Sequence, residues 1–148
     1  MTVTPSPLPP FSTEEKPFFG LDIPFMRYLG LVPEHIEEGY ARARLPAHPS
    51  LVNSRGDVHG GTLMGVLDFI LSAAARGHDP LNLGVVTVEM STHFLEVARG
   101  DLVFEATVLK RGRSTVFTEG KAMNADGTTA CVARATFRLI QLSKSPTS

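Results

Sequence analysis

The stretch NSRGDVHGGTLMGVLD, from Asn53 to Asp68, decides the fold and also raises a question about chemistry. It leads into an apolar run, LMGVLDFILSAAA, which begins at Leu63 and contains a single carboxylate, Asp68. An ionised carboxylate among carbon side chains is unfavourable unless something pairs with it or uses it. Two questions follow: which secondary structure the apolar run adopts, and what role Asp68 has within it.

The segment from His59 to Arg76 is predicted to be a long helix. The apolar residues on one face recur at helical spacing: Leu63, Val66, Leu67, Ile70, Leu71 and Ala74. The other faces are mostly apolar as well, which predicts a helix buried on nearly every side. Gly77 follows the apolar run and is expected to end the helix.

Four strands are predicted after this helix. In the first of them, apolar residues alternate with polar ones from Val86 to Phe94, which places Thr87 on the polar face. The NADG turn signal at 124–127 separates the last two strands. The other predicted strands after the helix cover 101–110, 115–123 and the segment after the NADG turn. Before the long helix, the sequence predicts a short helix from Pro24 to Gly30, a half-exposed strand over 37–45 and a loop over 46–57.

One buried helix and a mainly antiparallel sheet of about five to six strands predict an α+β domain. The sheet must curve round the helix, and it would leave some strand edge and some helix flank open. Self-association is therefore expected. Residues 1–17 are rich in Pro, Ser and Thr and are predicted to be a flexible arm, so that residues 18–148 form a single domain.

Composition excludes several classes of protein. The 148 residues include 43% hydrophobic residues and have a net charge of −1, which does not suggest nucleic-acid or anionic-membrane binding. The single cysteine, Cys131, excludes an internal disulfide, and no spacing of His, Cys and acids predicts a metal site. Without a secretory signal or an apolar stretch long enough to span a bilayer, we expect a soluble, cytoplasmic protein with no metal and no cofactor.

The His-Gly-Gly sequence at the helix start has the properties of an oxyanion hole. The first N–H groups of a helix lack intrahelical partners and carry the positive end of its dipole. The two glycines remove side-chain bulk, so a ligand oxygen can approach the N–H of Gly60 or Gly61. The alternatives are that these glycines only permit a tight turn and that Asp68 is a structural acid bonded to a neighbouring hydroxyl.

Asn53, His59-Gly60-Gly61 and Asp68 together form the pattern N-x5-HGG-x6-D. This pattern resembles that of the hotdog-fold acyl-CoA thioesterases of the phenylacetic-acid-degradation (PaaI-like) type. The resemblance covers roughly residues 45–140. It extends to VVTVEMSTHFLEVARGD, where Thr87 matches a position at which relatives carry Ser or Thr in the active site.

The resemblance implies hydrolysis of acyl-CoA to a free acid and coenzyme A, with a role for each residue. Asp68 would be the general base or the nucleophile, and the Gly60 N–H would polarise the thioester carbonyl. Asn53 would orient the carbonyl or the attacking water, His59 would fix the loop, and Thr87 would position water or Asp68. The resemblance also implies a homodimer or homotetramer, with active sites at the dimer interface.

Further contacts with the substrate are expected at two places. Gly61 and Met64 would line the site on the helix. The LKRGRS turn, with Lys110, Arg111 and Arg113, would contact the phosphates of coenzyme A, unless it is an ordinary solvated hairpin.

Two other functions stay open at this point. A hotdog dehydratase or hydratase would act on acyl thioesters, although relatives of that kind carry a His in a Pro- and Gly-rich loop, where this chain has HGG. An acyl-CoA binding module would hold the same ligand without turnover. The acyl group, aryl or aliphatic, is left open by the sequence.

Overall fold

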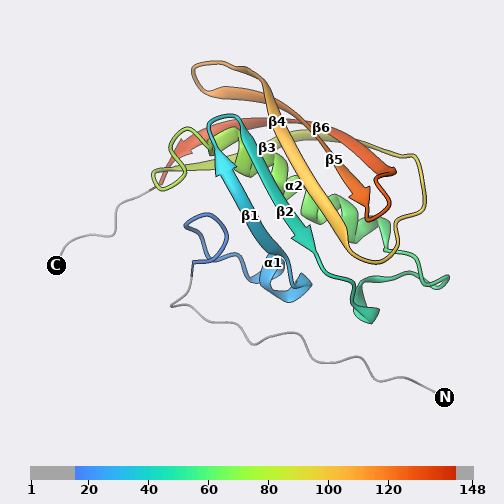
Figure 1. Ribbon diagram of the computed structural model, residues 1–148. Coiled ribbons are helices and arrows are strands. Elements are labelled where there is room, and N and C mark those ends of the chain that lie inside the picture. Colours follow the sequence, from blue (N-terminus) through green and yellow to red (C-terminus); the bar gives the residue numbers. More distant parts are fainter. Residues whose placement is uncertain (1–15, 143–148) are drawn as a thin grey trace.

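Helix α2 (Gly60–Arg76) lies at the centre of the fold, and a six-stranded sheet curves round it (Figure 1). The computed structural model describes residues 16–142, so most of the predicted N-terminal arm lies outside the described residues. The other elements are α1 (Pro24–Leu29), β1 (Val32–Glu37), β2 (Tyr40–Leu45), the 3-10 helix η1 (Pro49–Leu51), β3 (Leu83–Phe94), β4 (Leu102–Arg111), β5 (Thr115–Asn124) and β6 (Thr129–Gln141).

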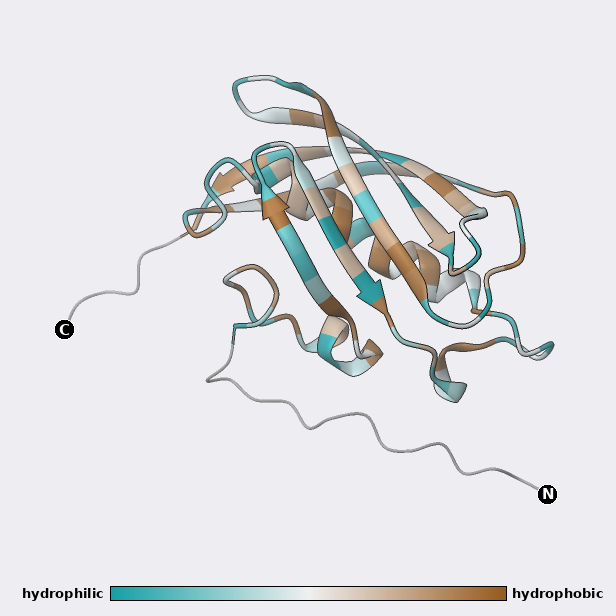
Figure 2. Cartoon of the chain, viewed as in Figure 1, coloured by the Kyte–Doolittle hydropathy of each residue, from teal (hydrophilic) through white to brown (hydrophobic). Residues whose placement is uncertain are grey.

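The strands lie in the order β1-β2-β4-β5-β6-β3, and every neighbouring pair is antiparallel. Strands β1 and β3 are therefore the two edges of the sheet. The predicted α+β class is confirmed, as are the long helix and the four strands that follow it. Figure 2 shows that hydrophobic residues predominate along α2, as expected for a helix enclosed by a sheet.

The predicted apolar face of α2 packs against the concave side of the sheet. Val66, Leu67 and Ile70 are fully buried, and so are Phe104 of β4 and Phe137 of β6. Truncating a large buried side chain of this kind to alanine typically lowers the free energy of unfolding by about 2–5 kcal/mol, because a cavity is left behind. This packing fixes how far each residue of α2 lies from the sheet.

One flank of α2 is not covered by the sheet, as expected for a helix that is buried on nearly every side but keeps some flank open. The sheet is open between its edges and encloses only part of the helix circumference. Met64 is 37% exposed and Asp68 is half-buried. We call this surface the open flank, and it consists of Gly61, Met64, Gly65, Asp68 and Ser72.

Helix α2 ends at Gly77, as predicted, but for a different reason. Gly77 keeps right-handed backbone angles, with φ −64° and ψ −15°, so it does not provide a left-handed cap. A Cβ atom at this position would overlap the carbonyl oxygen of Glu37, at the end of β1. The glycine is therefore required by the close approach of strand and helix.

The buried guanidinium of Arg76 ties the segment before α1 to the end of α2. Its nitrogens donate to the carbonyl oxygens of Phe18, Phe19 and Pro80 at 3.1, 3.2 and 2.6 Å. Burial lowers the pKa of Arg76 to about 10, so the side chain stays charged at neutral pH. The segment also packs through the rings of Phe18 and Phe19 on Phe69.

The structure differs from the sequence prediction before α2. A strand, β1, occupies residues 32–37, and the predicted strand over 37–45 begins only at Tyr40, after a turn with Gly39 at φ +75°. The predicted loop over 46–57 contains η1. Edge strand β1 is mostly exposed and includes Pro33, so it lacks the alternation by which a half-buried strand is recognised.

The predicted alternation in β3 is also wrong. The pairing of β3 with β6 shifts between Thr87 and Glu89, which is a β-bulge at Val88. Thr87 faces α2 like Val85 two residues before it, and the bulge lets Met90 face the same side, whereas Val86 and Val88 are 43% and 64% exposed. Bulges commonly redirect a side chain next to a functional site.

Candidate active site

The first turn of α2 presents one backbone N–H that has no partner. His59 is the N-cap, and its Nδ1 accepts a hydrogen bond from the Gly61 N–H at 2.8 Å. The N–H groups of Thr62 and Leu63 both donate to the His59 carbonyl oxygen. Within residues 16–142, the Gly60 N–H makes no hydrogen bond. Of the two glycine amides considered from the sequence, Gly60 is therefore the one available to a ligand.

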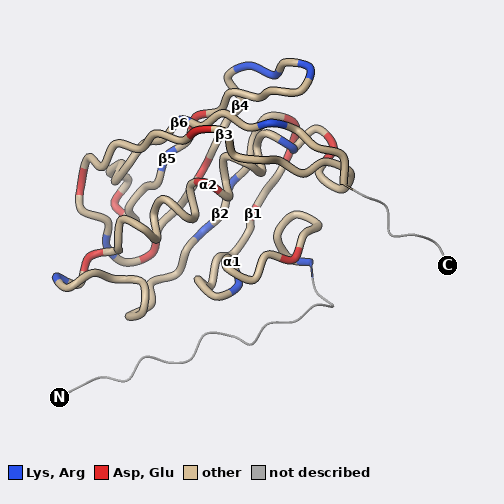
Figure 3. Tube along the Cα trace, turned by 180° about the vertical axis from the view of Figure 1, so that it is seen from behind, with Lys and Arg blue, Asp and Glu red and all other residues tan. Residues whose placement is uncertain are grey.

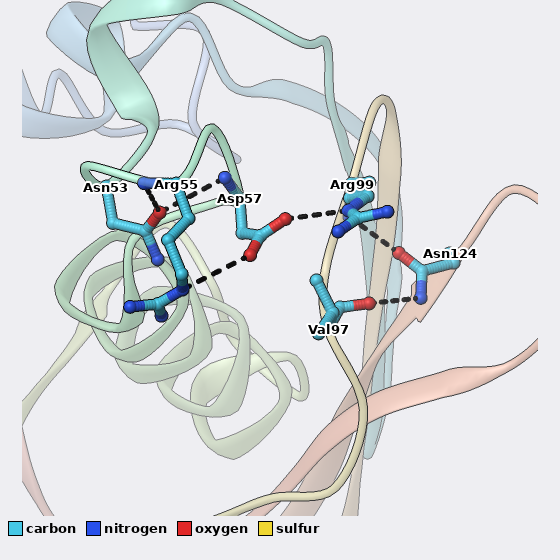
Figure 4. Close-up of polar contacts among 6 residues, drawn as sticks. All are labelled: Asn53, Arg55, Asp57, Val97, Arg99 and Asn124. Atoms are coloured by element: carbon cyan, nitrogen blue, oxygen red, sulfur yellow. Dashed lines mark hydrogen bonds and ion pairs between the residues drawn. The ribbon is translucent and has the colours of Figure 1, made fainter.

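The loop before α2 is fixed by Asn53. Its Oδ1 accepts hydrogen bonds from the N–H groups of Arg55 and Asp57, at 2.9 and 3.2 Å (Figure 4). The Asn53 N–H also donates to the Asp57 carbonyl oxygen at 2.7 Å. The side-chain oxygen is thus used within the loop, and the Nδ2 group, which makes no hydrogen bond within the described chain, is the end that can orient a ligand.

A buried acid braces the same loop against the segment after β3. Asp57 is 7% exposed, and its two carboxylate oxygens lie 2.7 Å from Arg99 Nε and 3.7 Å from Arg55 Nε (Figure 4). The Arg99 N–H in turn donates to Asn124 Oδ1 at 3.0 Å. Reasoning from the sequence missed this brace, because its members come from three separate segments that share no local spacing.

Asp68 and Thr87 form the second part of the candidate site. The Thr87 hydroxyl donates to Asp68 Oδ1 at 2.8 Å, which joins the open flank of α2 to β3. Thr87 faces the helix because it follows Val85, which packs against the core, by two residues, and the bulge at Val88 brings Met90 to the same face. Met64 lies one turn before Asp68 on the same flank. The carboxylate is thus oriented by a hydroxyl but still accessible.

The chain does not bring these two parts together. Asp68 follows Gly60 by eight residues in one continuous helix, which is about 12 Å along its axis. The structure therefore groups Asn53, His59 and Gly60 at the start of α2, and Asp68 with Thr87 further along.

The basic turn between β4 and β5 lies at the other end of α2 (Figure 3). Its cationic residues are Lys110, Arg111 and Arg113. Arg111 Nη1 lies 3.4 Å from Glu38 Oε1 in an exposed ion pair. Burial, together with the charge of Arg111, lowers the pKa of His78, which follows the end of α2. Within one chain, this turn is far from the start of the helix.

A hollow of about 740 Å³ lies elsewhere, on the outer face of the sheet. Its charged groups pair with one another: the Tyr40 hydroxyl donates to Glu105 at 3.0 Å, and Lys121 Nζ lies 3.5 Å from the same carboxylate. Arg134 pairs with Glu119 at 3.5 Å. The hollow is therefore a surface of satisfied ion pairs and does not contain the candidate site.

Residues 16–142 offer no group of three His, Cys, Asp or Glu side chains that could hold a metal ion. Burial raises the pKa of the Cys131 thiol to about 11, so this sulfur is not a thiolate nucleophile at neutral pH. No helix of the described part is long and apolar enough to cross a membrane.

Comparison with known proteins identifies the family. The thioesterase superfamily matches residues 55–131, just over half of the chain. A protein of Halobacterium salinarum, provisionally named an esterase, is 31% identical over 127 residues, which cover 78% of this chain and 84% of the relative. The PaaI protein of E. coli, from the phenylacetic acid degradation operon, superposes with a TM-score of 0.74 at 21% identity, over 80% of this chain and 86% of that one.

A Streptococcus mutans protein solved with bound acetyl CoA superposes with a TM-score of 0.69 at 19% identity, over 77% of this chain and 91% of its own. The chain belongs to the thioesterase superfamily. It has the hotdog fold that the sequence resemblance implied, the fold it shares with the PaaI protein. Its general reaction class is the hydrolysis of acyl thioesters.

Proposed function

We propose that the protein hydrolyses acyl-CoA thioesters as a dimer, with Gly60 of one subunit and Asp68 of the other acting on the same thioester. The observation that carries this proposal is the separation of the two groups. Each is equipped for its role, since the Gly60 N–H has no partner among the residues that the structure describes and Asp68 is oriented by Thr87. Both are fixed on one helix, about 12 Å apart.

A thioester cannot span that distance. An oxyanion donor lies about 3 Å from the carbonyl oxygen, and a base or nucleophile lies about 3 Å from the atom it acts on. With a C=O bond of about 1.2 Å, the Gly60 N–H and the Asp68 carboxylate must come within roughly 7 Å of each other for direct attack, and within roughly 10 Å when a water molecule lies between them. A second copy related by a two-fold axis can meet this condition, because it sets the start of one helix opposite the middle of the other, twice per dimer.

The open flank and the edge strand β3 supply a surface for such a dimer. Large apolar side chains are exposed along it: Met64 at 37%, Val86 at 43%, Val88 at 64% and Phe94 at 54%. Large exposed apolar side chains on a helix flank and an edge strand are typical of interaction sites. Strand β3 also has an unpaired edge, to which another chain could add a strand.

In the proposed reaction, the Asp68 carboxylate takes a proton from a water molecule, whose oxygen bonds to the thioester carbon. The developing negative charge on the carbonyl oxygen is stabilised by the partner's Gly60 N–H at the positive end of the helix. The C–S bond then breaks, and the thiolate of coenzyme A takes the proton. Direct attack by Asp68, through an anhydride that water then hydrolyses, is the other course of the same reaction.

The proposal is tested by incubating the protein with a panel of acyl-CoAs and a reagent for free thiols. Release of thiol is expected with at least one member of the panel. Tight binding without thiol release would instead indicate an acyl-CoA binding module. A change in an alkene with the thioester intact would indicate a dehydratase or hydratase.

The basic turn is expected to bind the phosphates of coenzyme A. Replacing Arg111 and Arg113 together by Ala should raise KM for acyl-CoA with kcat nearly unchanged, because uniform binding is lost. The exposed pair of Arg111 with Glu38 contributes little stability, so the variant should stay folded. Steady-state kinetics on acyl-CoA and on a short thioester without the nucleotide measure the effect.

A matched control removes the same charge elsewhere. Lys121 of β5 and Arg134 of β6 lie in ion pairs on the outer face of the sheet, and their double replacement by Ala should leave KM for acyl-CoA close to the wild-type value. If Arg111 and Arg113 act only through net charge, both double variants would raise KM alike. Equal losses on the two kinds of thioester would likewise contradict contact with the nucleotide.

A further inference from the structure

We infer that Phe25 of α1 is a specificity-determining residue, whose ring closes the acyl site beside Asp68 and limits the acyl chains it accepts. The inference rests on the proposed function, because it assigns the apolar surface next to Asp68 to the acyl part of the thioester. It also names the class of substrate, which is an acyl group with an uncharged, apolar body.

The ring of Phe25 lies directly on the open flank of α2. A Cβ atom placed on Gly65 would come within 2.8 Å of Phe25 Cε1 and 3.2 Å of Cζ. Gly65 is one turn before Asp68 on the same flank, so the ring edge lies about one helical turn from that residue. Phe25 is nonetheless 51% exposed, which leaves one side of an aromatic ring available to a ligand.

This ring is presented by an anchored element. Met26 and Leu29 of α1 are buried in the core, at 2% and 4% exposed. Arg27 Nη2 lies 3.0 Å from Asp22 Oδ1, which holds the start of the helix. Phe25 therefore projects from a fixed backbone, as a residue that sets the length of a pocket must do.

The glycine beneath the ring supports the same reading. Glycine in the interior of a helix costs about 1 kcal/mol relative to alanine. Gly65 has right-handed helical geometry within α2, so its backbone does not require a glycine. What does require it is space, since even one methyl group would displace the Phe25 ring.

The chemistry of this surface matches an apolar acyl group. Between Gly60 and Asp68, α2 carries no charged side chain, and Met64 adds a second exposed apolar group. A negatively charged acyl tail would find no cation on this stretch of α2 and would face the Asp68 carboxylate. An alkyl or aryl body would instead gain about 0.8 kcal/mol for each CH2 removed from water.

Two substitutions should move the chain-length preference in opposite directions. Phe25→Ala opens the pocket and should raise the ratio of kcat/KM for dodecanoyl-CoA to that for butanoyl-CoA by about tenfold, the effect of roughly two buried methylene groups. Gly65→Ala adds a methyl group under the ring and should lower this ratio by about threefold. Gly65→Ala favours the helix, so it provides a folded variant even if Phe25→Ala is unstable.

The matched control is Phe117→Ala. Phe117 is 43% exposed on β5 between the buried Val116 and Thr118, so its ring points away from α2. This variant should keep the wild-type ratio. If Phe25→Ala and Gly65→Ala both keep it as well, the inference is overturned while the proposed function stands. If the wild-type protein releases thiol from no acyl-CoA of any length, both are overturned.

Discussion

Asp68→Asn is expected to lower kcat on acyl-CoA by at least ~10²-fold, the usual loss when a general base is removed, with little change in KM. The amide keeps the size of the carboxylate and an oxygen that can still accept the Thr87 hydrogen bond, which is 2.8 Å long in the structure. It cannot take a proton from water, and it cannot form an anhydride. The Gly60 N–H still holds the carbonyl, so substrate binding should persist.

Melting temperature, subunit mass and kcat measured on one preparation separate this role from a structural one. Asp68 is half-buried and lies on the open flank, so its replacement should not lower the melting temperature. Asp79→Asn is the matched control, because Asp79 also accepts a side-chain hydrogen bond, from Asn82 at 2.9 Å, but lies beyond the end of α2. If well-folded Asp68→Asn turned over within about threefold of wild type, a difference below roughly 1 kcal/mol of barrier, Asp68 would not be the catalytic carboxylate.

The central helix was predictable because its signals are local. The apolar residues of α2 repeat with the helical period, and His59 caps it at the start of the predicted segment. The later strands were recognisable for the same reason, since buried and exposed residues alternate along β4 and β6. Edge strand β1 was not predicted, because it is mostly exposed and its sequence therefore shows no alternation of apolar and polar residues.

Part of the candidate site depends on features that a linear pattern does not contain. The partner of Asp68 is Thr87, yet alternation from Val86 onward places that hydroxyl on the wrong face. Val88 is an extra residue in β3, so the helix-facing positions change phase from Val85 and Thr87 to Met90, and such a residue has no sequence signature of its own here. The contact of Phe25 with Gly65 likewise joins two segments whose separation along the chain gives no hint of proximity.

The spacing of Gly60 and Asp68, by contrast, is visible in the sequence itself. It is part of the pattern N-x5-HGG-x6-D, but the distance between the two residues could be derived only once the structure showed that the helix is continuous. On one continuous α2 the two residues lie about 12 Å apart along the helix axis, and this separation is the reason for proposing a site shared between subunits. The proposed dimer can be tested on the two groups separately.

Gly60→Pro is expected to lower kcat/KM by about 10²–10³-fold, because it deletes the N–H that would stabilise the oxyanion. Proline suits this position, which is the first residue of α2, and the preceding His59 has the extended angles, φ −62° and ψ 136°, that proline requires of its neighbour. Gly60→Ala is the control. It keeps the N–H, and its Cβ would lie 3.6 Å from the Phe94 ring, an ordinary contact, so it should stay within about threefold of wild type.

Combining Gly60→Pro with Asp68→Asn in one dimer tests whether the two groups act across the subunit interface. The two variants would be co-expressed with different tags, and the heterodimer would be purified on both. If each site takes Gly60 from one subunit and Asp68 from the other, one of the two sites in this heterodimer has both groups intact and the other has neither. Thiol release should then recover to about half of the wild-type activity per dimer, since two-fold symmetry makes the sites equivalent. If Gly60 and Asp68 instead act within their own chain, every site lacks one group, and the heterodimer stays as inactive as its parents.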